Sequence, residues 1–167
     1  MKTEAEIVEL LAQRESVPDS VERETLIRTS LADQYATVAG PIGMIHVGFT
    51  SQGVSSIVPT PDEVEFLAAH ARRVGRKAYP GELPDRLATR LGKVLESGRL
   101  GKLPVDLRVL TSFQRDVLEV TASIPPGEVR PYGWVAREMG SKGAVRAVGS
   151  ALARNPVPIA IPCHRVV

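Results

Sequence analysis

A single cysteine lies close to the C-terminal end of the sequence, in a setting suited to nucleophilic chemistry. Cys163 is followed directly by His164 and Arg165, and three prolines stiffen the apolar approach to it: Pro156, Pro158 and Pro162. A reactive cysteine needs a neighbouring base or positive charge that stabilises its thiolate, whereas a lone cysteine usually packs as a small apolar side chain. Adjacent residues of an extended chain point in opposite directions. His164 can therefore reach the sulfur only if the backbone turns at Cys163.

A helix-turn-helix outline precedes this segment. Residues 132–139 and 144–154 predict two helices, and the Gly-containing residues 140–143 predict the turn between them. The second helix holds Arg146 among small residues: Ala144, Ala147, Gly149, Ser150, Ala151 and Ala153. Gly149 costs roughly 1 kcal/mol of helix propensity relative to alanine, so a close approach to another surface should offset it. That surface is either a neighbouring helix or a nucleic-acid groove, and most helical hairpins do not bind DNA.

The segment around Cys163 resembles the active-site signature of the 6-O-alkylguanine-DNA alkyltransferases, also called methylated-DNA–protein-cysteine methyltransferases. Residues 161–167 (Ile-Pro-Cys-His-Arg-Val-Val) carry the resemblance, together with Tyr132 and residues 127–129, 144–149 and 155–158, all at the family's spacing without gaps. The close similarity covers about residues 111–167, and a looser one extends back to about residue 34.

The resemblance implies DNA repair by direct reversal, with no cofactor and no metal. Cys163 would accept an alkyl (methyl) group from the 6-oxygen of guanine in a single turnover, and His164 would act as the base through a water. Residues of the helix pair would bind double-stranded DNA in the minor groove, with Arg146 filling the gap left by the flipped base: Tyr132, Arg146, Ala144, Ala147, Gly149 and Ser150. Three residues would line the pocket for the base: Tyr132, Asn155 and Val166. The resemblance also implies that Asn155 braces the turn that holds Cys163.

Charge and composition are compatible with this function. The formal net charge of the 167 residues is only +2, but residues 129–167 hold six Lys/Arg against one Glu. Such a segment is either an electrostatic footprint for phosphates or a solvated face. One cysteine excludes an internal disulfide framework and a Cys-rich zinc site. The sequence has no long apolar run and no signal peptide, so we expect a cytoplasmic, monomeric protein with no membrane partner.

The alternation of motifs predicts three segments. Residues 1–33 form a helical extension, with helices over 4–15 and 21–31, the second capped by Ser20. Residues 34–110 form an α/β domain with a small antiparallel sheet (35–39, 44–50, 54–58), a further strand over 103–110, and helices over 61–77 and 84–98. Residues 111–167 form a mostly helical domain that binds DNA and holds the active site.

Finer expectations attach to these elements. The resemblance implies a ribonuclease-H-like α/β unit followed by a winged-helix-like, helix-turn-helix unit. His46 should be a half-buried structural histidine, Ser112 should cap the helix over 113–123, and the basic run 72–77 should be a solvated helix end. The inward stripe of the helix over 61–77 should consist of Val64, Leu67, Ala68 and Ala71.

Two alternatives to alkyl transfer stay open at this point. Family members continue beyond the motif with a Gly-rich loop and a helix whose glutamate hydrogen-bonds the histidine, whereas this sequence ends four residues after Cys163. Glu128 or Glu138 would have to substitute for that glutamate. One alternative is therefore a catalytically impaired, DNA-lesion-binding member of the family that keeps Tyr132 and Arg146. The other is a plain helix-turn-helix regulatory module. Retention of Cys163 favours transfer.

Overall fold

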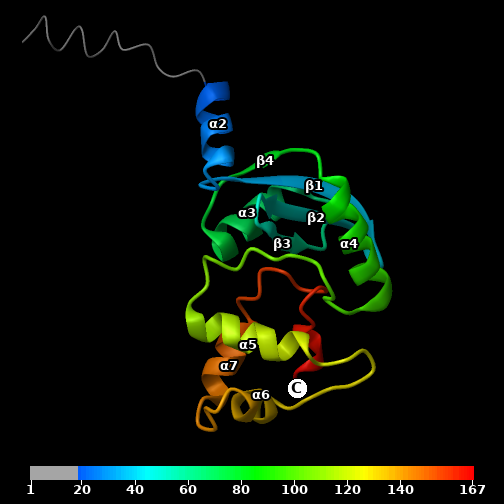
Figure 1. Cartoon of the computed structure of the whole chain (residues 1–167), viewed down its shortest axis with the longest axis vertical. Helices are drawn as coiled ribbons and strands as arrows, with labels where there is room; N and C mark the ends of the chain where they lie inside the picture. The colour runs from blue at the N-terminus through cyan, green and yellow to red at the C-terminus, as the bar shows by residue number, and fades with distance from the viewer. Residues whose placement is uncertain (1–18) are drawn as a thin grey trace, which may run out of the picture.

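The structure, a computed structural model, describes residues 19–167, so the helix expected over 4–15 lies outside the described residues. After helix α2 (Asp19–Arg28), a sheet with helices α3 (Glu63–Val74) and α4 (Asp85–Ser97) lies above a helical unit (Figure 1). The helical unit contains α5 (Ser112–Ala122), α6 (Tyr132–Glu138), α7 (Val145–Leu152) and the 3-10 turn η1 (Cys163–Arg165). A small mixed sheet followed by helices confirms the general fold class predicted from the sequence.

The sheet is built on the predicted antiparallel meander. Strands β1 (Asp33–Gly40), β2 (Gly43–Thr50) and β3 (Gly53–Val58) pair antiparallel in succession. A short strand not expected from the sequence, β4 (Ala78–Pro80), pairs parallel with β1 and gives the order β3-β2-β1-β4. Gly53 has a φ of 144° and a Cβ there would lie 2.4 Å from the Pro104 carbonyl oxygen, so only glycine fits at this turn.

Helix α3 confirms the predicted helix but not its buried face. Asp62 caps it by accepting hydrogen bonds from the N–H groups of Val64 and Glu65. The buried residues are Phe66, Ala69, His70 and Val74, whereas Val64 is 75% exposed. The predicted stripe was wrong because it chose small aliphatic residues over Phe66, whose large ring buries more apolar area.

Residues 103–110 do not form the predicted strand. They run as an extended strap that touches the sheet at one isolated bridge, between Val105 and Val54. The Val54 N–H donates to the Pro104 carbonyl at 3.0 Å, and the Asp106 N–H donates to the Val54 carbonyl at 2.8 Å. The alternating pattern failed as a predictor here because Asp106, one of the polar positions, is itself buried.

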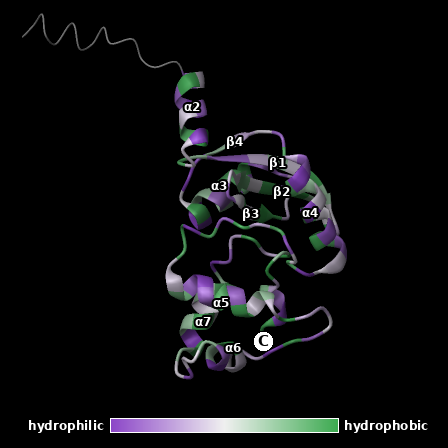
Figure 2. Cartoon of the chain, viewed as in Figure 1, coloured by the Kyte–Doolittle hydropathy of each residue, from purple (hydrophilic) through white to green (hydrophobic). Residues whose placement is uncertain are grey.

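The helices of the second unit occur where they were predicted, with small corrections. Thr111, not Ser112, caps α5 through a capping box with Gln114. Ser20 likewise lies within α2 rather than capping it. Apolar residues of α5, α6 and α7 join those of the sheet in one continuous core, which includes Ile45, Val47, Val117, Val135 and Val148. Polar residues dominate the outward faces of the helices (Figure 2).

Candidate active site and nucleic-acid interface

The backbone turns at Cys163, which is the condition for His164 to reach the sulfur. Cys163 begins η1, and the Val166 N–H donates to the Cys163 carbonyl at 3.1 Å. The Cys163 N–H in turn donates to the Ile161 carbonyl at 2.9 Å. Cys163 is half-buried and His164 is exposed. The cysteine is thus held firmly by its backbone without being sealed in the apolar core.

Asn155 braces the loop that leads to the cysteine. Its side-chain Nδ2 donates to the Ile161 carbonyl at 2.9 Å, and its Oδ1 accepts the Val157 N–H at 3.0 Å. Only 4% of Asn155 is exposed. Within the loop, Ile159 has a φ of 74°, a left-handed conformation that costs a β-branched residue energy. The asparagine bonds span that strained residue and hold the loop closed.

Arg165 and Val166 anchor the motif to its surroundings. The Arg165 guanidinium donates to the carbonyl of Ile124 and to that of Gly98, both at 2.9 Å. Val166 is buried and forms an isolated bridge with Arg130. The sequence offered no signal for this part played by Arg165, because spacing along the chain does not reveal contacts with the ends of two helices.

The remaining predicted DNA contacts lie on one exposed side of α6 and α7. Arg146, Ala147 and Ser150 are exposed, while the opposite side of α7 buries Val148, Ala151 and Leu152. The half-buried residues of the set are Ala144 and Gly149.

The surroundings of Gly149 distinguish the two reasons considered for a glycine in this helix. A Cβ at Gly149 would meet the ring of Tyr132 at 3.7 Å, an ordinary van der Waals distance. Tight packing within the chain therefore does not require glycine there. The packing of Gly149 thus gives no support to the first of the two reasons, a neighbouring helix, and Tyr132, 37% exposed, lies directly beside Gly149.

Neither glutamate considered as a partner for His164 is joined to it among the described residues. Glu128 is paired with Arg130, and Arg130 also lies over the Trp134 ring at 5.4 Å from its centroid. Glu138 is exposed at the end of α6. No hydrogen bond or ion pair within residues 19–167 connects a carboxylate to His164.

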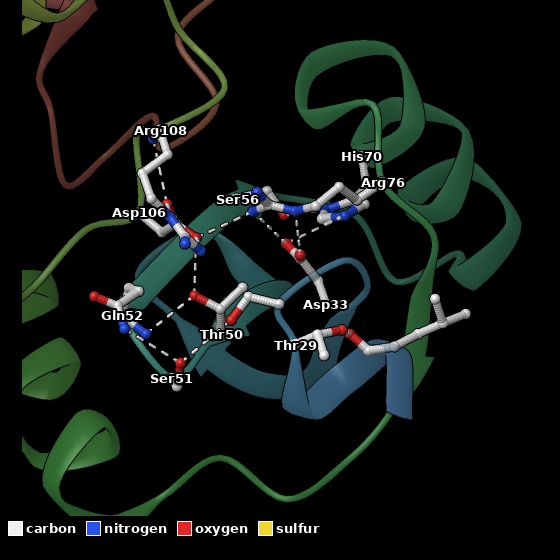
Figure 3. Close-up of polar contacts among 12 residues, drawn as sticks. Thr29, Asp33, Thr50, Ser51, Gln52, Ser56, His70, Arg76, Asp106 and Arg108 are labelled. Atoms are coloured by element: carbon white, nitrogen blue, oxygen red, sulfur yellow. Dashed lines mark hydrogen bonds and ion pairs between the residues drawn. The ribbon is translucent and has the colours of Figure 1, made fainter. Parts of the chain in front are cut away.

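A second polar cluster, which the sequence did not predict, joins the start of β1 to helix α3, the residues after it and the strap that carries Asp106 (Figure 3). The Arg76 Nε donates to Asp33 Oδ1 at 2.5 Å, and its Nη2 contacts Asp106 Oδ2 at 3.2 Å. His70 Nε2 lies 3.5 Å from Asp33 Oδ2. The expectation that residues 72–77 form only a solvated helix end is thus wrong for Arg76, which joins two buried carboxylates. We call Asp33, His70, Arg76 and Asp106 the buried ionic cluster.

Burial and pairing shift the pKa values within this cluster. Burial raises the pKa of Asp106, but hydrogen bonds from Arg108 and Thr50 and the charge of Arg76 outweigh it and hold the pKa well below its usual range. Burial lowers the pKa of His70, and the nearby Arg76 lowers it further, against the opposing charge of Asp33. Asp33 and His70 are almost fully enclosed, so these groups stabilise the sheet and do not meet a substrate.

His46 is another structural histidine, as predicted, although it is buried rather than half-buried. Its Nδ1 lies 2.9 Å from the Thr60 carbonyl oxygen, and its ring stacks on Phe66. Within residues 19–167, no group of three or more His, Cys, Asp or Glu side chains is placed to hold a metal ion. No helix of this part of the chain is long and apolar enough to cross a membrane.

These features define a class of protein: a small sheet unit followed by a helix pair with an exposed small-residue face and a braced cysteine turn. Residues 112–167 match the family model described as "6-O-methylguanine DNA methyltransferase, DNA binding domain". The chain is 34% identical over 141 residues to a methylated-DNA–protein-cysteine methyltransferase of Shigella flexneri, with 82% of this chain and 81% of the relative covered. It belongs to this methyltransferase family.

Other relatives give the same assignment. The enzyme of that name from Salmonella typhimurium is 49% identical over 113 residues, which is 62% of this chain and 61% of the relative. Among solved structures, "OGT in complex with DNA" from Mycobacterium tuberculosis has a TM-score of 0.61 at 30% identity and covers 80% of this chain and 78% of that chain. The O6-methylguanine-DNA methyltransferase of Pyrococcus kodakaraensis, at 24% identity and a TM-score of 0.55, supports the fold alone.

Proposed function

We infer that the protein repairs DNA by direct reversal, transferring an alkyl group from the 6-oxygen of guanine to Cys163. The observation that carries this inference is the position of Cys163: half-buried, at the start of a braced turn, and followed by an exposed histidine. In a member of this methyltransferase family, that arrangement supports transfer over a lesion-binding protein without activity. It also disfavours a plain helix-turn-helix regulator, which has no use for a braced cysteine.

The chemistry needs few groups. The Cys163 thiol loses its proton to His164, through a water, and the thiolate attacks the alkyl carbon. The S–C bond forms as the C–O bond to guanine breaks, and the guanine keeps the electron pair and takes up a proton. The thioether product is stable, so each protein molecule serves one lesion without a cofactor.

DNA is the partner that the helix pair supports, and we propose double-stranded DNA containing alkylated guanine as the specific ligand. The 6-oxygen lies inside the base stack, so the base must be extruded at a cost of a few kcal/mol. Arg146 would enter the helix in its place, while Ala144, Ala147, Gly149 and Ser150 lie against the minor groove. Tyr132, Asn155 and the Val166 carbonyl would form the pocket for the base.

The family resemblance also supports proposals about the folds of the two units, the oligomeric state and the location of the protein. We propose a ribonuclease-H-like sheet unit over 34–110 and a winged-helix-like unit over 111–167, preceded by an extension over 1–33. A monomer in the cytoplasm suits a protein that acts once on a single lesion.

The decisive experiment is a single-turnover transfer assay. The full chain is incubated with a duplex that contains one 6-O-methylguanine, and the peptide that contains Cys163 is examined by mass spectrometry. We expect the gain of one methyl group on that peptide and none in the Cys163→Ser variant, which should still bind the duplex. An unmodified wild-type peptide after prolonged incubation would refute alkyl transfer, and DNA binding without modification would favour the lesion-binding alternative.

A further inference from the structure

A basic cavity of about 610 Å³ lies between the sheet unit and the helical unit. Its charged lining consists of three arginines: Arg72 and Arg73 at the end of α3, and Arg154 just after α7. Gln114 of α5 and apolar residues of the strap complete the lining, which contains no carboxylate. Figure 1 shows the end of α3, the start of α5 and helix α7 on the same flank of the molecule.

The donors of this cavity have no acceptors within the described part of the chain. Arg73 Nη1 is buried and makes no hydrogen bond there. No ion pair within residues 19–167 involves Arg72, Arg73 or Arg154. Arg76, only three residues after Arg73, pairs with both Asp33 and Asp106. The cavity therefore holds the positive charges of three arginines, and no carboxylate of residues 19–167 neutralises them.

Gln114 adds a further donor. Its Oε1 accepts the Thr111 N–H at 3.0 Å in the capping box of α5. That bond fixes the amide and leaves its Nε2 group, which carries two N–H donors. Guanidinium forks and amide N–H groups together form the donor set that a phosphate group accepts best.

The cavity adjoins the C-terminal end of α7, because Ala153 and Arg154, which follow that helix directly, line it. Arg146, Ala147 and Ser150 are exposed on that helix, and the exposed Arg154 follows its end by two residues. Eight residues at about 1.5 Å each separate Arg146 from Arg154, or about 12 Å along the axis. The minor groove is about 6 Å wide, so a helix that places Arg146 in the groove brings Arg154 to the sugar-phosphate backbone beside it.

We propose that this cavity binds a backbone phosphate of the DNA that flanks the lesion, with Arg72 and Arg73 as its principal ligands. The proposal rests on the proposed DNA-binding function and extends the DNA contact from the helix pair to the sheet unit. Phosphate contacts position the protein and add affinity without reading sequence. The sheet unit would thus contribute directly to DNA affinity through α3.

The test compares the double variant Arg72→Ala/Arg73→Ala with wild type in duplex binding at several salt concentrations. We expect affinity for a duplex of about two helical turns to fall about three- to tenfold. The slope of log Kd against log salt should decrease by about 0.9 for each phosphate that the variant no longer neutralises. Affinity for a duplex of roughly 10 base pairs, one turn, should change less. Arg86→Ala, an exposed arginine on α4, is the matched control and should change neither quantity.

Further arms separate the possible failures. Because Arg73 is partly buried, Arg72→Ala and Arg154→Ala are measured singly, and thermal unfolding confirms that each variant folds; each should show part of the loss. Unchanged affinity and salt slope in all these variants, with wild type still binding duplex, would overturn this proposal and leave the proposed function intact. Binding of pyrophosphate to wild type but not to the double variant, with duplex affinity unchanged, would also overturn it by revealing a small-anion site. Failure of wild type to bind any duplex would refute the proposed function itself.

Discussion

The two units of this protein differ in where their principal charged side chains lie: buried in the sheet unit and exposed in the helical unit. In the sheet unit, the charges of Asp33 and Arg76 are enclosed and paired with each other. The buried His70 lies beside them and shares a hydrogen bond with Ser56. In the helical unit, His164 and Arg146 are exposed. A buried charge must be paired to be tolerated, whereas a group that meets a ligand must be left available. The contrast separates the groups that stabilise this fold from those that we propose act on DNA.

The largest expected effect on stability comes from breaking an ion pair in the buried ionic cluster. Asp33→Asn leaves Arg76 with only Asp106 as a partner, so we expect the free energy of unfolding to fall by about 3 kcal/mol or more. Urea unfolding measures this loss. Glu128→Gln, which breaks the exposed pair with Arg130, is the matched control and should cost less than about 1 kcal/mol. Equal losses in the two variants would erase the contrast between the units.

Asn155 is an exception, since it is a buried polar side chain in the helical unit, in which the polar residues Arg146 and His164 are exposed. Asn155→Ala leaves the Ile161 carbonyl and the Val157 N–H without their partner, at a cost of about 2–3 kcal/mol. The transfer rate should fall as well, because the loop before Cys163 loosens. Asn155→Asp keeps the acceptor but puts an unpaired negative charge against the Ile161 carbonyl oxygen in a buried site, so it should be at least as destabilised as the alanine variant in thermal unfolding. A stable Asn155→Ala protein with normal transfer would remove the bracing role.

Arg146→Ala tests the role of an exposed charged residue of the helical unit. We expect transfer from a duplex substrate to slow about tenfold, or about 1.4 kcal/mol, with no change in stability, because the folded chain keeps all of its internal interactions. Transfer from the free 6-O-methylguanine base should be unaffected, since no base has to be extruded. Arg137→Ala, an exposed arginine on α6, is the control. Equal slowing on duplex and free base would contradict the part assigned to Arg146.

The smallest effect is a pH dependence of stability that originates in the sheet unit. His70 has a lowered pKa in the folded protein, so the unfolded chain takes up a proton first as the pH falls below about 6.5. The stabilisation is therefore complete above that pH and is lost as the pH falls towards the folded pKa. Urea midpoints between about pH 8 and pH 5 should decline in wild type and less so in His70→Gln. His164→Gln, which changes an exposed histidine of the helical unit, is the control and should show the same decline as wild type. If the decline is unchanged in His70→Gln, His70 is not its source.

The contrast also explains what could be predicted from the sequence. The meander of β1 to β3 and the α6–α7 pair depend on local signals, namely glycines at turns and helical periodicity. The turn at Cys163 was only a condition for contact between His164 and the sulfur, because the spacing of residues does not establish it. The parallel pairing of β4 and the partners of Arg76 depend on contacts between residues far apart in sequence, such as Arg76 and Asp33, 43 positions apart. Neither has a local signature.

The failures among the predicted details have related causes. The stripe of α3 and the strand over 103–110 were predicted from apolar periodicity, which assumes that polar residues face water. His70 and Asp106 are buried instead, so the pattern predicted the wrong buried face for α3, although the helix itself was correct, and a strand over 103–110 that does not form. The motif around Cys163 identified the candidate site residues directly, and the family resemblance implied that Asn155 braces the turn; the structure adds the two hydrogen bonds by which Asn155 does so, to Ile161 and Val157.

Arg165 gives the cysteine turn a dependence on distant parts of the chain. Its guanidinium bridges Gly98, which ends α4, and Ile124, which follows α5. With the roles that we propose, a mutational scan of three successive positions would find inactivity at each for a different reason. Cys163 variants would lack the proposed nucleophile, His164 variants the proposed base, and Arg165 variants the contacts that hold the turn in place. Only the last defect should respond to low temperature or a stabilising co-solute, which makes conditional rescue a simple way to separate architecture from reactivity in this tripeptide.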